Sequence, residues 1–229
     1  MPDNAGRRPH DCQPTPEGMS RMILIGQYDS PFVRRVAIAL HLYGIAYEHR
    51  PWSTFGDGDR IAQFNPLRRV PTLVLDDGEV LIDSAAILDH LDEGMDPSRA
   101  LIAHGGPARR RALKVCALAT GLADKAVSLV YERVLHQQIS QAWIDRCVGQ
   151  VGGVLDALQA DRAGRSSAFW FGDAIGHADI AVACVLRFAA EAHSAQFDIA
   201  RWPALASHAS RCEALPPFQV IAQQFIPPN

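Results

Sequence analysis

The sequence has no long apolar run, no paired cysteines and no large excess of one charge. Arg, Asp, Gly or His interrupts every apolar stretch before it reaches the roughly 18 to 20 residues of a membrane span, so we expect no membrane protein. The balance of 22 Lys and Arg against 25 Asp and Glu leaves a net charge of -3. This near-neutral balance argues against a nucleic-acid-binding surface.

The five cysteines are an odd and widely scattered set. They contain no C-x-x-C pair and no short Cys/His spacing, which argues against disulfides and against a zinc site. We therefore expect reduced thiols, no metal and a cytoplasmic location. Residues 1–21 lack the apolar segment of a signal peptide and are predicted to be a disordered leader.

Residues 22–96 alternate short strand patterns with helix patterns, which is typical of a small α/β domain. Ser30 and Pro31 are the N-cap and first-turn residues of a helix that ends at Gly44. An Asp-Gly pair between the last two strands predicts a hairpin turn. The predicted strands cover 22–25, 47–50, 72–75 and 79–82, and the predicted helices cover 30–44, 59–64 and 84–94. The resulting order is β-α-β-α-β-β-α.

Residues 97–107 contain Pro, Ser and a Gly-Gly-Pro sequence, and they predict a linker before a second domain at 108–229. Apolar residues in this second domain recur every three or four positions without any strand pattern, so it is predicted to be all-α. The helix predicted at 176–192 is apolar on every side and therefore belongs at the centre of the domain. The other predicted helices cover 108–136, 143–158, 202–212 and 218–225.

Polar residues of the second domain are interpreted as structural. Gly176 and Asp179 fit the cap at the beginning of the central helix, where backbone donors would satisfy the Asp179 carboxylate. The other histidines have no metal-ligand spacing and are predicted to lie at the surface. They are His41, His90, His136, His193 and His208.

Four motifs follow one another along the chain. They are SPFVRRV at 30–36, NPLRRVP at 65–71, LIDSAAI at 81–87 and GDAIGHADI at 172–180. Together they resemble the motifs of the cytosolic glutathione transferase family, and most closely those of bacterial members with serine at the activating position. The resemblance spans about residues 22–226. It implies a thioredoxin-like domain followed by an all-α domain, and a homodimer.

The resemblance implies that Ser30 activates the thiol of glutathione, which is a co-substrate. A free thiol with a pKa near 8.5 is only about 3% ionised at pH 7. A hydroxyl that donates to the sulfur anion at a helix N-terminus contributes about 1.5 to 3 kcal/mol, or about one to two pKa units. Ser30 therefore stabilises the nucleophile and does not attack. The segment SPFV contains no cysteine, which excludes dithiol exchange.

The resemblance also assigns glutathione contacts to two turns of the first domain. Val70 and Pro71 resemble a cis-proline turn that presents the Val70 backbone to the cysteinyl part of glutathione. Asp83 is expected to pair with the α-ammonium group, and Ser84 to receive the α-carboxylate at a helix N-terminus. A role for Ser84 in capping alone stays open, as does an ordinary bend at Val70.

The glycyl carboxylate of glutathione is expected to meet a cation. Arg68 and Arg69 stand where the family has Gly and Lys, and Arg69 is the first choice for this contact. A solvated surface role for Arg69 is the alternative. Gln63 is a weaker candidate for the same contact.

The acceptor pocket is expected between the two domains, facing Ser30. The residues assigned to it are Tyr28, Phe32, Thr120, Asp124 and Tyr131. Most of these positions fit an interdomain core equally well. Asp124 differs because it interrupts an apolar stretch, where it could orient an acceptor.

The functional hypothesis is a glutathione transferase that joins the glutathione thiolate to a small hydrophobic electrophile. Two alternatives stay open. One is a glutathione-binding interaction or stress-response protein without turnover, and the other is a glutathione-dependent peroxidase or isomerase. The same glutathione contacts serve all three.

Overall fold

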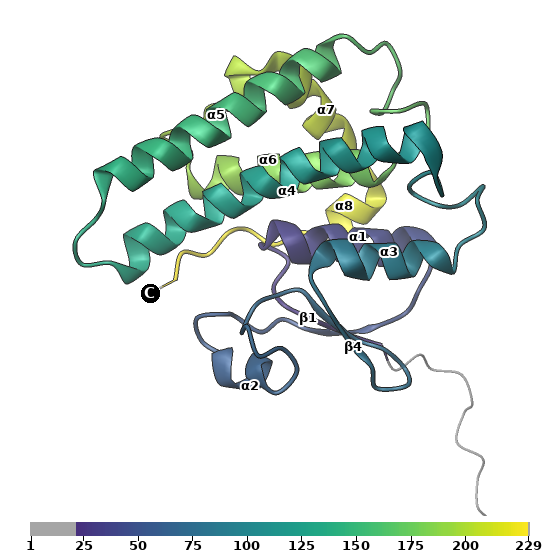
Figure 1. Ribbon diagram of the computed structural model, residues 1–229, viewed down its shortest axis with the longest axis horizontal. Helices are drawn as coiled ribbons and strands as arrows, with labels where there is room; N and C mark the ends of the chain where they lie inside the picture. Colours follow the sequence, from purple (N-terminus) through teal and green to yellow (C-terminus); the bar gives the residue numbers. More distant parts are fainter. Residues whose placement is uncertain (1–21, 229) are drawn as a thin grey trace, which may run out of the picture.

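The computed structural model describes residues 22–228, which form a small sheet with three helices and a larger helical bundle on one side of it (Figure 1). The leader predicted for residues 1–21 lies outside the described residues. Among the described residues, no helix is long and apolar enough to cross a membrane.

The first part of the chain is a four-stranded sheet with helices on its faces. Its elements are β1 (Ile23–Ile25), α1 (Pro31–Tyr43), β2 (Glu48–Arg50), α2 (Gly58–Ala62), β3 (Thr72–Val74), β4 (Val80–Ile82) and α3 (Ser84–Glu93). The strand order is β2-β1-β3-β4, and only the pair β1 and β2 is parallel. This arrangement confirms the predicted α/β thioredoxin-like fold of the first part.

Helix α1 lies between the sheet and the bundle (Figure 1). It begins after Ser30, with Pro31 in its first turn, and ends at Gly44, whose φ of 72° is a left-handed conformation that glycine adopts without strain. The helix packs against α3 and against α6 (His177–Ala192). Residues 36–40 are consequently all 0% exposed.

The second part of the chain is all-helical, as predicted. Its elements are α4 (Gly106–Leu135), α5 (Gln141–Ala163), α6, a 3-10 turn (Ile199–Arg201), α7 (Pro203–Glu213) and α8 (Pro216–Val220). Helix α6 packs against α4, α7 and α1, so neighbours cover every side of it. This position explains why its sequence is apolar all round.

The N-terminus of helix α6 is capped by the carboxylate of Asp179, a residue in the first turn of the helix. Asp179 Oδ2 accepts a hydrogen bond from the Gly176 N–H at 2.8 Å, and Oδ1 accepts one from the Trp170 N–H at 2.7 Å. A Cβ at Gly176 would come within 2.7 Å of the Leu101 carbonyl oxygen, which accepts the His177 N–H at 2.9 Å. Glycine at this cap is therefore required by close packing.

The helix predicted at 218–225 has the wrong bounds. Helix α8 starts earlier, with Pro216 and Pro217 in its first turn, and ends at Val220. Residues 222–228 have no regular secondary structure. The backbone of this segment bonds to a distant side chain instead, since the Phe225 N–H donates to Glu191 Oε2 at 2.7 Å. We call residues 222–228 the C-terminal tail.

The surface position predicted for two histidines is wrong. His193 and His208 are only 1% and 2% exposed. The His193 Nε2 lies 2.8 Å from the Ala126 carbonyl oxygen, and the His208 ring packs edge-on against Trp170. Tertiary contacts of this kind join residues far apart in the sequence, so local spacing gave no sign of them.

Candidate active site between the sheet and the helical bundle

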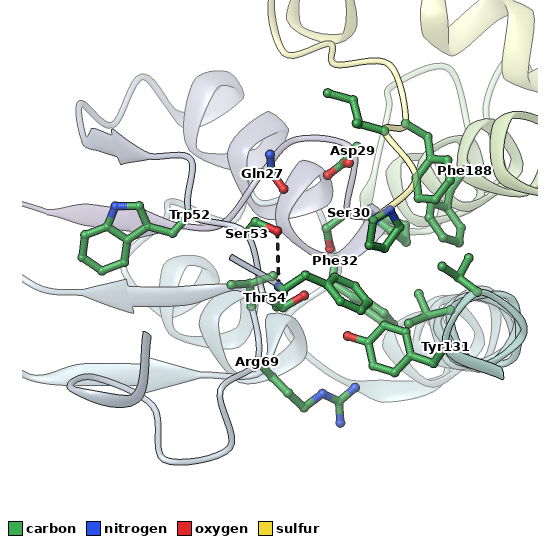
Figure 2. A pocket seen from close by; sticks show the side chains of 18 residues that line it. Gln27, Asp29, Ser30, Phe32, Trp52, Ser53, Thr54, Arg69, Tyr131 and Phe188 are labelled. Carbon is green, nitrogen blue, oxygen red and sulfur yellow. Dashed lines mark hydrogen bonds between the residues drawn. The ribbon is translucent and has the colours of Figure 1, made fainter. Parts of the chain in front are cut away.

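A cavity opens at the N-terminus of α1, where the sheet meets the helical bundle (Figure 2). We call it the Ser30 cavity. The loop before α1, the loop after β2, helices α4 and α6 and the C-terminal tail all contribute to its walls. The side formed by α4, α6 and residues 225–228 is apolar and includes Tyr131, Phe188, Phe225 and Ile226, whereas the loops before α1 and after β2 contribute the polar residues Gln27, Asp29, Ser53 and Thr54.

Ser30 has the geometry of a helix cap with a free donor. Its backbone is extended, with φ −67° and ψ 122°, and its hydroxyl oxygen accepts the Val33 N–H at a long 3.4 Å. The hydroxyl proton has no acceptor among the described residues. The Ser30 O–H can therefore donate to a group placed in the cavity.

The C-terminal tail forms one wall of the Ser30 cavity, which the sequence did not indicate. Phe225 packs edge-on against Phe188 with ring centres 5.4 Å apart. The Tyr28 N–H donates to Gln223 Oε1 at 3.1 Å, which connects the tail to the first part of the chain. Tail and bundle thus enclose the cavity together.

Asp29, next to Ser30, is a residue of this site that sequence reasoning missed. Its carboxyl lies at the cavity, where burial raises its pKa and backbone N–H groups of Ile226 and Ser30 partly offset that rise. The contact with Ile226 indicates that Asp29 holds the tail. Only its position beside Ser30 could have drawn attention to it.

A second cavity adjoins the first and shares Phe32, Arg69 and Val70 with it. We call it the Asp83 cavity. The Val70–Pro71 peptide bond is cis, as the resemblance implies. Neither the N–H nor the C=O of Val70 has a hydrogen-bond partner among the described residues. Both backbone groups are therefore free to bind an extended ligand.

Asp83 and Ser84 lie together in the Asp83 cavity at the start of α3. The cap residue is Asp83, not Ser84 as predicted, because the Asp83 carboxylate accepts the Ala85 N–H at 2.7 Å. Asp83 has a φ of 70°, a sparsely populated conformation for a residue with a side chain. Ser84 is buried as the first helical residue, where its N–H has no partner within the helix.

Arg69 and Asp124 form an ion pair across the two parts of the chain. Arg69 Nη2 lies 3.3 Å from Asp124 Oδ1, and both side chains are more than half exposed. Asp124 and Thr120 line the Asp83 cavity and not the Ser30 cavity, because they lie nearer the N-terminus of α4 than Val127 and Tyr131, which are on the same face of the helix and line the Ser30 cavity. The Thr120 hydroxyl donates to the Cys116 carbonyl oxygen at 3.0 Å, so its proton is already used.

Two predicted site residues lie away from both cavities. The Tyr28 ring stacks on His49 with ring centres 3.9 Å apart, and its hydroxyl lies 2.8 Å from the Tyr47 hydroxyl. Gln63 is exposed at the C-terminal end of α2. Of the predicted acceptor residues, Phe32 and Tyr131 line the Ser30 cavity, where Tyr131 packs edge-on against Phe55.

Comparison with known proteins gives the family. The model of the glutathione S-transferase N-terminal domain matches residues 24–99, and that of the C-terminal domain matches residues 141–211. The maleylacetoacetate isomerase of Pseudomonas aeruginosa is 33% identical over 209 residues, which cover 86% of this chain and 94% of that protein. The chain belongs to the glutathione S-transferase family.

Other relatives agree with this membership. The uncharacterised GST-like protein YibF of Escherichia coli K12 is 32% identical over 168 residues, 73% of this chain and 81% of that protein. A glutathione S-transferase crystal structure from Methylobacillus flagellatus with glutathione bound has 28% identity and a TM-score of 0.80, covering 88% of this chain and 98% of that one. One from Methylobacterium radiotolerans, in complex with glutathione sulfonate, has 27% identity and a TM-score of 0.82, covering 90% and 98%. The chain is a glutathione transferase enzyme.

Proposed function

We propose that this glutathione transferase catalyses attack of the glutathione thiolate on an electrophilic carbon of a small apolar acceptor. The observation that carries the proposal is the Ser30 hydroxyl, which stands at the N-terminus of α1 with a free donor, in a cavity whose wall from α4, α6 and the C-terminal tail is apolar. A thiolate there would meet an O–H donor and the positive end of the helix dipole. Both favour the ionised form of the thiol.

The Asp83 cavity supplies suitable groups for the rest of glutathione. The free N–H and C=O of Val70 suit the cysteinyl backbone, as an added strand would use them. The free N–H of Ser84 at the start of α3 suits the α-carboxylate. The unusual φ of Asp83 supports a ligand-binding role, because strained residues gather at such sites.

Replacement of Asp83 by Asn separates ligand binding from helix capping. Asn retains an oxygen for the Ala85 N–H and tolerates a positive φ, so Asp83→Asn is expected to melt near the native temperature. Loss of the charge leaves the ligand's ammonium unpaired, which costs about 1 to 3 kcal/mol, or about five- to 150-fold in affinity for glutathione. Calorimetric titration measures this loss. The control is His90→Ala on the same helix, and equal affinity in the two variants would refute the assignment.

The ion pair between Arg69 and Asp124 supports a second contact, in which the glycyl carboxylate of glutathione displaces Asp124 from Arg69. Asp124→Asn then frees the guanidinium. Exposed pairs contribute about 0.2 to 1 kcal/mol, so affinity for glutathione is expected to rise by up to about fivefold. Asp59→Asn is the control, because it breaks the neighbouring pair with Arg68 at 3.1 Å. A weaker affinity in Asp124→Asn would show that Asp124 itself holds the ligand.

Glutathione-dependent isomerisation is the second candidate, because relatives from Pseudomonas aeruginosa and mouse are named maleylacetoacetate isomerase. A substrate of that name carries two carboxylates and needs cations around it. Among the described residues, the cation that lines the Ser30 cavity is Arg69, and the proposed contact with the glycyl carboxylate of glutathione already uses it. The apolar walls therefore favour an apolar acceptor.

A panel of acceptors tests the proposal directly. The purified protein is assayed with glutathione and 1-chloro-2,4-dinitrobenzene, 4-nitrobenzyl chloride, cumene hydroperoxide and maleylacetoacetate in parallel. Turnover of the two aryl or benzyl halides supports conjugation. Turnover restricted to the hydroperoxide or to maleylacetoacetate supports a peroxidase or an isomerase. Calorimetric binding of glutathione without any turnover would contradict the proposal.

A further inference from the structure

The Ser30 hydroxyl is held only weakly by its own helix cap. Its oxygen accepts the Val33 N–H at 3.4 Å, which is longer than most N–H···O hydrogen bonds. Ser30 is carried by residues 26–30, the connection between β1 and α1, which we call the Ser30 loop. Gln27 and Asp29 of this loop line the Ser30 cavity beside it (Figure 2). The place of the hydroxyl in the cavity therefore depends on what fixes the loop.

Tyr28 attaches the middle of the Ser30 loop to β2 and to the C-terminal tail. Its ring stacks on the His49 ring of β2, with ring centres 3.9 Å apart and an angle of 3° between the ring planes. Its hydroxyl lies 2.8 Å from the hydroxyl of Tyr47, the residue before β2. Its N–H donates to Gln223 Oε1 of the tail at 3.1 Å. The side chain and the backbone of Tyr28 are thus fixed by two different parts of the chain.

His49 also fixes the beginning of the Ser30 loop. Its Nε2 lies 2.8 Å from the Gly26 carbonyl oxygen, and because a carbonyl oxygen only accepts, Nε2 is the donor. The Gly26 N–H donates to the Arg50 carbonyl oxygen at 2.9 Å, which adds a second bond to β2. Between this fixed point and α1, the Tyr28 side chain keeps the loop against β2.

We propose that Tyr28 is a positioning residue for Ser30, because its ring on His49 keeps the Ser30 loop where the Ser30 hydroxyl can meet the thiolate of glutathione. This inference rests on the proposed function, in which that hydroxyl stabilises the thiolate. Tyr28 lines neither the Ser30 cavity nor the Asp83 cavity, so it acts through the loop and not by contact with glutathione. Hydrogen bonds depend strongly on their geometry, and a displacement of about 1 Å at a reacting group can cost about a hundredfold in rate.

The thiol pKa of bound glutathione, read from the thiolate absorbance against pH, tests this role. Tyr28→Leu removes the stack on His49, so the thiol pKa is expected to rise toward its value in Ser30→Ala, and conjugation to slow by up to about tenfold. Affinity for glutathione should stay near the wild-type value, because the proposed contacts lie in the Asp83 cavity. Tyr28→Phe keeps the ring and is expected to restore the wild-type pKa. Phe171→Leu is the control, because it removes a ring that packs on Arg165 outside both cavities.

A double variant separates positioning from a merely structural role. If Tyr28 acts through the Ser30 hydroxyl, Tyr28→Leu adds no further rise in the thiol pKa to that of Ser30→Ala. His49→Ala removes the stack from the other side and gives the same test if Tyr28→Leu does not fold. Where Ser30→Ala raises the thiol pKa, a wild-type value in a folded Tyr28→Leu or His49→Ala protein, or a rise that adds to that of Ser30→Ala, overturns the inference alone. An unchanged thiol pKa in Ser30→Ala refutes the proposed function, and the inference with it.

Discussion

A Ser30→Ala protein is expected to fold normally, to bind glutathione with most of its affinity, and to conjugate it ten- to a hundredfold more slowly. The rate falls because the thiolate loses a hydrogen bond of about 1.5 to 3 kcal/mol. Stability should change little, because the hydroxyl accepts the Val33 N–H at 3.4 Å and caps α1 weakly. Loss of a cap costs typically about 1 kcal/mol.

The decisive measurement is the thiolate absorbance of the glutathione complex against pH, beside the steady-state rate. In Ser30→Ala the thiol pKa should rise by about one to two units relative to the wild-type complex. Ser53→Ala is the matched control, because Ser53 lines the same cavity and its hydroxyl accepts the Phe55 N–H. If the thiolate titration is the same in wild type and Ser30→Ala, Ser30 has no part in activating the thiol.

An Asp179→Ala protein is expected to show the opposite behaviour, with a lower free energy of unfolding and a poor soluble yield. The Asp179 side chain is 1% exposed and accepts the N–H groups of Gly176 and Trp170, which lose their acceptor in the variant. Each buried donor left without a partner costs about 1 to 3 kcal/mol. We expect the substitution to lower stability and not to impair catalysis directly, because Asp179 lines neither the Ser30 cavity nor the Asp83 cavity.

Urea titration of Asp179→Ala, together with its steady-state kinetics, tests whether Asp179 acts in folding and not in catalysis. The fraction that folds should bind glutathione normally, since the proposed contacts lie at α1, β3 and α3. Asp156→Ala is a useful comparison, because that carboxylate accepts a hydrogen bond from the Trp202 indole N–H on the far side of the bundle. A stable Asp179→Ala protein without turnover would make Asp179 part of the chemistry.

Several features of the candidate site could be predicted because their causes are local. Ser30 and Pro31 identify the start of α1, since capping and proline preferences act within one turn. Asp83 shows the limit of this reasoning. The sequence predicted that α3 begins at a cap and indicated Ser84 as the cap residue. Only the backbone conformation showed that Asp83 occupies the cap position.

The sequence alone determined the order of the elements, the buried character of α6 and the position of Ser30, because periodicity and capping depend on residues a few positions apart. Only the tertiary structure decided which residues meet at the cavities. The Arg69 pair with Asp124 and the Tyr28 bond to Gln223 join residues 55 and 195 positions apart, and the Ser30 cavity forms only where the first part of the chain packs against α4, α6 and the C-terminal tail. No local preference encodes such contacts, since they depend on how the two parts of the chain pack against each other.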